Sequence, residues 1–342
     1  MRRLIKLLST ALMCALFMSM WVITGEAVEN TVKLGEIFSG QIGESREDVY
    51  KFNVPTSGTV TFTYNYKNSS YNRFIVMDEY DNMVIYLQMG EGKHNTTLNL
   101  MAGNYKVIVR QYMGDPQLQY TVTSKFTSSQ ETVKETPLNK NDDEKTASTY
   151  KVSEKYSGQL SVNDDIDVYK MTIKKHGYIK ITLNSKLPDM DLEIKNTKGS
   201  VIYEKKSVKA GKRTYSYFCP KGTYYISFIS KETGNYDFKI VNSGIPTTKI
   251  NKVKNTKTRK LTVTWKRKSK VDGYKIQYST NKSFKKNNKT AIVGGNKKNT
   301  RVFSKLKKNK KYYVRVCTYV KDSNGKIYYS KWSAKKAIRI SK

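Results

Sequence analysis

The chain has 342 residues, a length that predicts two or three domains, each large enough to bury a core of its own. It contains 63 Lys and Arg against 28 Asp and Glu, so its net charge at pH 7 is +35. Three cysteines are too few for a disulfide-stapled scaffold, and two histidines leave little material for general acid–base catalysis.

The first 27 residues have the layout of a secretory signal peptide. Basic residues near the start precede an apolar run over residues 7–23, and Gly25 and Ala27 fit a cleavage site. Cleavage would leave Cys219 and Cys317 as the remaining cysteines and no transmembrane span. An uncleaved anchor is the alternative, because the apolar run is long. We expect a protein secreted into a bacterial, Gram-positive-type envelope, extracellular or associated with the cell wall.

After this segment the chain repeats one cassette. Ser39-Gly40-Gln41 followed by Asp48-Val49-Tyr50-Lys51 recurs as Ser157-Gly158-Gln159 followed by Asp167-Val168-Tyr169-Lys170. The landmarks recur at a spacing of roughly 118 residues, which is too long for a solenoid repeat and indicates a duplicated domain.

Both copies show the period-two alternation of short strands. Val60, Phe62 and Tyr64 alternate with threonines, and turn residues separate such runs, as in an all-β sandwich. We place the copies at residues 28–126 and 150–242. The polar segment 127–149 between them predicts a flexible linker.

The two copies resemble the bacterial pre-peptidase C-terminal domain, a jelly-roll-like β-sandwich. The matching positions are Asp48, Tyr50, Phe52, Gly58, Gly103 and Tyr105 in the first copy, and Asp167, Tyr169, Gly177, Gly199, Gly222 and Tyr224 in the second, where Met171 replaces the phenylalanine. In that family the domain accompanies secreted proteases and aids targeting or substrate attachment, and some relatives bind collagen and calcium. The resemblance gives Asp48, Tyr50, Asp167 and Tyr169 structural roles.

Residues 243–342 read as a third β-domain, which looks like a fibronectin type III module. Trp265 fits the strand-B tryptophan, and Leu306 followed by Tyr312 fits the pattern before strand F. Residues 329–333, with Trp332, are similar to the Trp-Ser-x-Trp-Ser box of receptor modules. The resemblance implies that Trp265, Tyr312 and Trp332 are structural and that Arg315 stacks on the rings of the box.

The excess positive charge is concentrated in this third domain. It has roughly thirty Lys and Arg but only two acids, Asp272 and Asp322, which favours a polyanionic partner. The candidate binding residues are Lys266, Arg267, Lys268, Lys270, Lys285, Lys286, Lys307, Lys308, Lys310 and Lys311. Tyr319 and Tyr328 are expected to be exposed and able to stack on sugars or bases. The alternative is a lysine-rich surface that only keeps the domain soluble.

Few other residues offer chemistry. Asp164, Asp165 and Asp167 cluster oxygen ligands as a weak calcium site would, although turn capping is the better explanation, and no other cofactor is expected. His94 and His176 are read as polar-loop residues without a nucleophile nearby, and Cys317 as an inert thiol.

The sequence therefore predicts an all-β, non-enzymatic, monomeric binding or adhesion protein. Its expected partners are an anionic cell-wall polymer or a matrix protein or glycan, and not nucleic acid, because no nucleic-acid-binding fold is indicated. The alternatives are an accessory subunit or inhibitor of a secreted peptidase or glycan-active enzyme, and a structural spacer that binds nothing.

Overall fold

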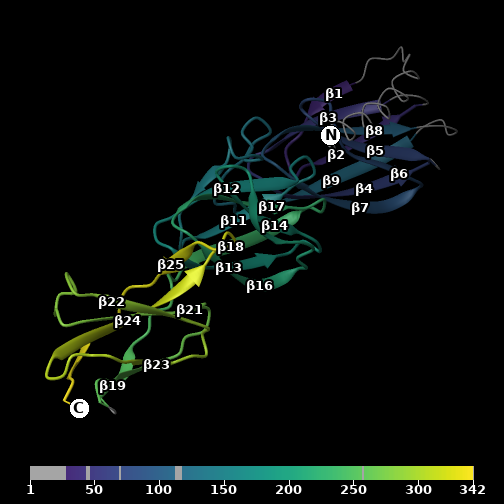
Figure 1. Ribbon diagram of the computed structural model, residues 1–342. Helices are drawn as coiled ribbons and strands as arrows, with labels where there is room; N and C mark the ends of the chain where they lie inside the picture. Colours follow the sequence, from purple (N-terminus) through teal and green to yellow (C-terminus); the bar gives the residue numbers. More distant parts are fainter. Residues whose placement is uncertain (1–27, 44–46, 69–70, 112–117, 256–257, 342) are drawn as a thin grey trace. The chain divides into compact units, whose positions relative to one another are not determined.

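The computed structural model describes residues 28–43, 47–68, 71–111, 118–255 and 258–341 (Figure 1). The predicted signal peptide, residues 1–27, lies outside this range. The described residues form strands, turns and loops without a helix, so the all-β prediction is confirmed. Consequently, no helix in this part of the chain is long and apolar enough to cross a membrane.

The first copy is a two-sheet sandwich. Its larger sheet has the strand order β1-β3-β8-β5-β6 and its smaller sheet the order β2-β9-β4-β7. The strands are β1 (Val28–Thr31), β2 (Ile37–Ile42), β3 (Glu47–Val54), β4 (Gly58–Lys67), β5 (Asn72–Asp78), β6 (Met83–Met89), β7 (Gly92–Leu100), β8 (Gly103–Gln111) and β9 (Leu118–Ser128). Val60, Phe62 and Tyr64 of β4 are buried, as the alternation predicts.

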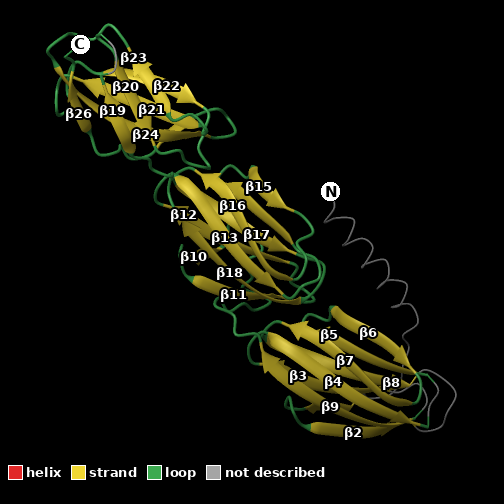
Figure 2. Ribbon diagram, turned by 90° about the horizontal axis from the view of Figure 1, so that it is seen from below, coloured by secondary structure: helices red, strands yellow, loops and turns green. Residues whose placement is uncertain are grey.

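The second copy repeats this topology strand for strand (Figure 2). Its sheets have the orders β10-β12-β17-β14-β15 and β11-β18-β13-β16, and each copy begins with a parallel edge pair, β1 with β3 and β10 with β12. The strands are β10 (Ser148–Tyr150), β11 (Lys155–Leu160), β12 (Ile166–Ile173), β13 (Gly177–Ser185), β14 (Asp191–Asn196), β15 (Val201–Lys205), β16 (Gly211–Cys219), β17 (Gly222–Ile229) and β18 (Gly234–Asn242). The shared topology supports a duplication.

The repeated Asp-x-Tyr motif forms a hydrogen-bonded triad in the first copy. The hydroxyl of Tyr120 donates to Oδ2 of Asp48 at 2.5 Å, and the hydroxyls of Tyr50 and Tyr120 are 2.6 Å apart. Burial, together with the hydrogen bond to Asp48, raises the pKa of Tyr120 far above its usual value. Gly40 is needed beside this triad, because a Cβ there would lie 2.4 Å from the Tyr120 hydroxyl.

The second copy builds the same triad. Tyr236 donates to Oδ2 of Asp167, and the hydroxyls of Tyr169 and Tyr236 are 3.1 Å apart. All three side chains are buried. Asp and Tyr recur at these positions because each needs the other inside the sandwich, where an unpaired carboxylate is costly.

The outward-facing row across the larger sheet differs between the copies. In the first copy it is apolar, and Val49, Ile108 and Ile75 lie side by side across β3, β8 and β5. The equivalent residues of the second copy are Val168, Ser227 and Glu193. The copies therefore share a sandwich core but differ on the other side of the larger sheet, where Val49, Ile75 and Ile108 as well as Val168 and Ser227 are buried.

The segment between the two copies is more structured than a solvated linker. Strand β9 extends to Ser128 and β10 begins at Ser148, and between them the side chains of Glu135 and Asn141 are buried. Both oxygens of Asn141, the backbone carbonyl and Oδ1, accept hydrogen bonds from Val168 N at 2.8 Å. The polar composition that predicted flexibility instead provides these hydrogen-bonding groups.

The third domain is a smaller sandwich with sheets of the orders β19-β20-β23 and β22-β21-β24-β25, and β26 also pairs with β24. Its core surrounds Trp265 and Tyr274, whose ring centroids are 5.2 Å apart. The strands are β19 (Ile250–Lys254), β20 (Leu261–Trp265), β21 (Gly273–Ser279), β22 (Lys289–Gly294), β23 (Thr300–Phe303), β24 (Lys311–Lys321), β25 (Ile327–Tyr329) and β26 (Lys336–Arg339).

The connector before this domain is tied to the start of β13. Ser243 N donates to Tyr178 O at 2.9 Å, and Tyr178 N donates to Gly244 O at 3.3 Å. A Cβ on Gly177 would lie 2.1 Å from the Cα of Gly244, so only glycine fits there.

Candidate polyanion-binding surface

The strand pairing of the third domain defines its two ends. Ile250 pairs with Trp265 and Gly273 with Tyr319 where the chain enters the domain, so the loops 266–272, 295–299 and 322–326 form the entry end. Residues 255 and 258–260, together with the loops 280–288 and 304–310, form the opposite end. The chain leaves the domain there, since Asn309 N donates to Ile340 O at 2.7 Å. We call the latter the exit end.

The predicted basic residues divide between these ends. Those of the loop 266–272 lie at the entry end, and those of residues 280–288 and 304–311 lie at the exit end. The entry-end residues are Lys266, Arg267, Lys268 and Lys270; the exit-end residues are Lys285, Lys286, Lys307, Lys308, Lys310 and Lys311. All are exposed except Lys268, which is half-buried. The structure therefore does not bring the ten residues onto one face.

The loop 280–288 is fixed by side-chain hydrogen bonds. The Ser279 hydroxyl donates to Lys286 O at 2.8 Å and accepts from Asn281 N at 3.0 Å. Asn288 Nδ2 donates to Phe284 O at 2.6 Å, and the Phe284 ring is buried. Lys285 and Lys286 are thus carried on an ordered turn.

The loop 304–310 is fixed by Tyr312 and by the neighbouring residues 258–260. Lys307 N donates to the Tyr312 hydroxyl at 3.0 Å. Leu306 is buried and exchanges hydrogen bonds with Arg259, because Leu306 N donates to Arg259 O at 3.1 Å and Arg259 Nε donates to Leu306 O at 2.9 Å. Tyr312 therefore fixes the loop that carries the exposed side chains of Lys307 and Lys308.

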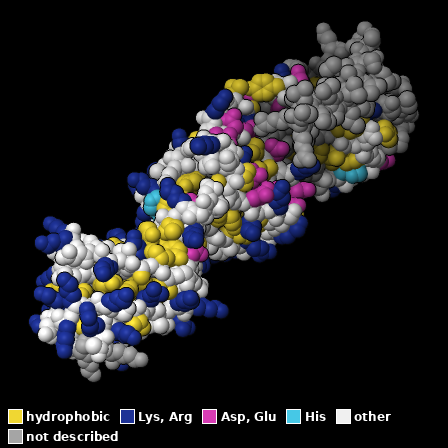
Figure 3. Space-filling view, viewed as in Figure 1, with side chains coloured by type: hydrophobic (Ala, Val, Ile, Leu, Met, Phe, Trp, Pro, Cys, Tyr) yellow, Lys and Arg dark blue, Asp and Glu magenta, His cyan; other side chains and the backbone are white. Residues whose placement is uncertain are grey.

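The two acids of the domain lie at the entry end, where they accept hydrogen bonds from backbone N–H groups and from a tyrosine hydroxyl. Asp272 Oδ2 accepts from Lys321 N at 2.7 Å, and Asp322 accepts from Lys326 N at 3.0 Å and from the Tyr328 hydroxyl at 3.0 Å. Within the described part of the third domain, no Lys or Arg forms an ion pair with a carboxylate. Figure 3 shows Lys and Arg side chains across the visible face of the domain. Their charge is therefore not neutralised by ion pairs within the described part of the domain.

The box around Trp332 forms a stacked array. The Arg315 guanidinium lies between two rings, 4.2 Å from the Phe284 centroid and 4.5 Å from the Trp332 centroid, and its Nε donates to Gln277 Oε1 at 2.7 Å. Arg315 stacks on Trp332 as the resemblance implies, while Phe284 was not anticipated because its loop reads as polar. Desolvation lowers the pKa of Arg315.

The tyrosines expected to stack on a ligand are not free to do so. Tyr319 is only 4% exposed, because its ring packs against that of Tyr329. The expectation that Tyr319 is exposed is therefore wrong. Tyr328 is half-buried, and its hydroxyl is held by Asp322. The exposed aromatic ring at this position is Tyr329, which lies under Lys275 Nζ at 4.5 Å from the centroid.

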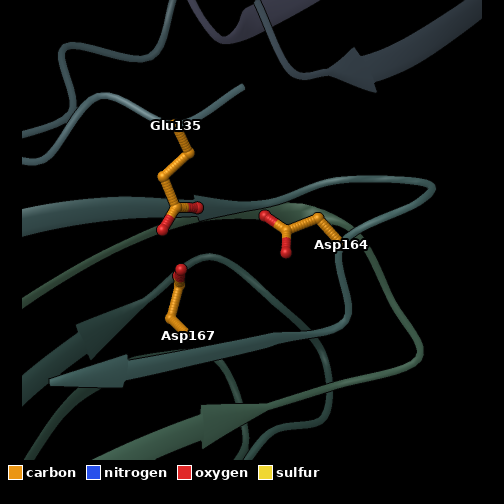
Figure 4. Close-up of side chains that lie close together, drawn as sticks. All are labelled: Glu135, Asp164 and Asp167. Carbon is orange, nitrogen blue, oxygen red and sulfur yellow. The ribbon is translucent and has the colours of Figure 1, made fainter. Parts of the chain in front are cut away.

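The aspartates of the predicted calcium loop are placed differently from one another. Asp165 is exposed, Asp164 is buried, and the carboxylate of Asp167 accepts from Tyr236. Carboxylate oxygens of Glu135 and Asp164 lie within 4.8 Å, and Figure 4 shows these two side chains with Asp167, which follows three residues later in the chain. Calcium prefers carboxylate oxygens of this kind as ligands, and calcium binding at this position stays a prediction. Glu135 escaped sequence analysis because it lies in the apparent linker.

Each of the two histidines lies within hydrogen-bond distance of a backbone atom, and Cys219 and Cys317 are buried. His94 is not in a loop as expected but in β7, opposite Tyr64, with Nε2 3.0 Å from Gly90 O. His176 lies in a turn, where its Nδ1 accepts from Lys221 N at 2.8 Å. Burial raises the pKa of Cys219 to about 12 and that of Cys317 to about 11, so neither thiol is reactive near neutral pH.

Residues 246–334 match the family model of the fibronectin type III domain, which confirms the prediction for the third domain. No curated protein matches the chain. Among solved structures, the pre-peptidase C-terminal domain of collagenase from Bacillus anthracis is 22% identical, covers 30% of this chain and 100% of that one, and has a TM-score of 0.28. A structure described as a myokine is 15% identical over 28% of this chain and 96% of that one, with a TM-score of 0.23.

A third solved structure, a beta-1,2-glucanase from Parabacteroides distasonis, is 9% identical over 56% of this chain and 32% of that one, with a TM-score of 0.24. The fold and the basic surface define a protein of several β-sandwich modules that includes a fibronectin type III domain.

Proposed function

We propose that the chain is an exported, non-catalytic binding protein that its basic third domain retains on an anionic polymer of the cell wall or extracellular matrix. The two preceding sandwiches then engage a protein or glycan. The match of the third domain to the fibronectin type III family supports an extracellular or binding-type protein.

The observation that carries this proposal is the separation of charges in the third domain. Its lysines are mostly exposed, and its two acids are engaged by backbone N–H groups and by the Tyr328 hydroxyl. A surface of this kind attracts polyanions by its summed field, which is stronger than that of a surface with interspersed acids.

The test is the salt dependence of retention. Full-length protein is bound to purified cell walls and eluted with increasing NaCl, with walls stripped of phosphate polymers as the matched control. Exposed charges are screened over about 8 Å at physiological salt and about 3 Å at 1 M, so retention should fall steeply as salt rises. Retention that persists in 1 M salt, or that is equal on stripped walls, would refute the proposal.

A further inference from the structure

We infer that the exit end of the third domain is the contact site and that its ligand is a linear phosphodiester polymer of the polyol-phosphate class. This inference rests on the proposed function and narrows it to one end of one domain. The predicted basic residues do not by themselves indicate which end binds the ligand, because they are divided between the two ends.

Charge composition separates the ends. The three exit-end loops contain no Asp or Glu, whereas both acids of the domain lie in or beside the entry-end loops. The exit-end lysines 285, 286, 305, 307, 308 and 310 are exposed. A polyanion approaching this end meets positive charge alone, which concentrates it there and steers its binding.

The exit end is ordered, as is the entry end, where Lys268 N donates to the Tyr274 hydroxyl at 2.8 Å. Lys286 O, Lys307 N and Leu306 are each held by the hydrogen bonds of the two loops. Lys305 and Asn309 adopt left-handed backbone conformations, with φ of 58° and 59°, which turn the loop sharply at both sides of the lysines. Cations on fixed loops lose less conformational entropy on binding than cations on a mobile tail.

The side chains of the site indicate the ligand class. The cations are almost all lysines, whose compact ammonium groups bind phosphate as point charges and do not require the fixed bidentate geometry of a single group. Of the aromatic rings near these loops, Phe284 and Tyr312 are buried. Tyr313 and Trp332 are half-buried, and each lies beneath a cation, Lys311 and Arg315 respectively, which leaves bases little free ring surface for stacking. A phosphate polymer without bases fits these groups better than a single-stranded nucleic acid.

The experiment compares two full-length variants that each lose four positive charges. The exit-end variant is Lys285→Gln, Lys286→Gln, Lys307→Gln and Lys308→Gln; the entry-end variant is Lys266→Gln, Arg267→Gln, Lys297→Gln and Lys298→Gln. The hydrogen bonds that fix the loops at Lys286 and Lys307 use backbone atoms, so the exit-end variant should keep its fold. Affinity for poly(glycerol phosphate) is measured against salt concentration, and thermal unfolding checks the fold.

The exit-end variant should lose at least ~10-fold in affinity and show a shallower salt dependence, while the entry-end variant stays within ~2-fold of the unmodified protein. A third variant with arginine at the same four exit-end positions should keep its affinity. Equal losses in both glutamine variants, or tighter binding of single-stranded DNA than of the polyol polymer at matched charge, would overturn this inference. If the unmodified protein binds no anionic polymer, the proposed function itself fails.

Discussion

The hydroxyl of Tyr120 reaches the carboxylate of Asp48 at 2.5 Å, although 72 residues separate them in the chain. This bond joins β9 of the smaller sheet to β3 of the larger one. Tyr236 and Asp167 make the same connection in the second copy. The triad therefore locks the two sheets of each sandwich together.

Replacing Tyr120 by phenylalanine should destabilise the first sandwich by about 1–3 kcal/mol, because Asp48 loses its donor inside the structure. The change is measured as a shift in the urea unfolding midpoint. Tyr80→Phe is the control, since Tyr80 is 50% exposed and its removal should leave the midpoint unchanged. An unaltered midpoint for Tyr120→Phe would show that the triad contributes no net stability.

The triads also show how far sequence reasoning reaches. Asp48 and Tyr50 are visible in the sequence as repeated landmarks, since a duplication preserves the residues that its core requires. Their contact with Tyr120 is not visible there, because strand order decides which distant residues meet. The sequence also does not show that the basic residues divide between two ends, because the positions of the loops follow from the pairing of the strands.

The array around Arg315 predicts that arginine cannot be replaced by lysine. In Arg315→Lys the planar group between Phe284 and Trp332 is lost together with the hydrogen bond from Nε to Gln277. The expected cost is about 1–2 kcal/mol for the third domain, although charge is conserved. Thermal unfolding measures it, and Lys331→Arg at an exposed position is the control. An unchanged unfolding temperature would contradict a stabilising role of the stack.

Gly177 predicts a steric effect at the connector. In Gly177→Ala the added methyl group would lie 2.1 Å from the Cα of Gly244, so the connector must move away from β13. We expect destabilisation by about 1–3 kcal/mol and greater protease sensitivity near residues 243–246. Gly43→Ala is the matched control, because a Cβ there meets no atom within 4 Å. Equal protease resistance of both variants would rule out the predicted clash.

Glu131 makes stability depend on pH. Its carboxyl accepts from Gln159 N at 2.9 Å and bonds the Ser57 side chain, but burial dominates and raises its pKa from 4.5 to about 7. The folded state therefore holds this proton more tightly than the unfolded chain. The contribution to stability is complete below pH 4.5 and is lost as the pH rises to about 7.

Glutamine imitates the protonated carboxyl and cannot ionise, so Glu131→Gln should remove this dependence. The variant should match the unmodified protein at pH 4.5 and unfold a few °C higher, on the order of 2–6 °C, at pH 8. Scanning calorimetry at both pH values measures the difference, and Glu36→Gln at an exposed site is the control. A Glu131→Gln variant that is equally stable to the unmodified protein at pH 8 would show that ionised Glu131 is not penalised in the folded state, because solvent then reaches its carboxylate.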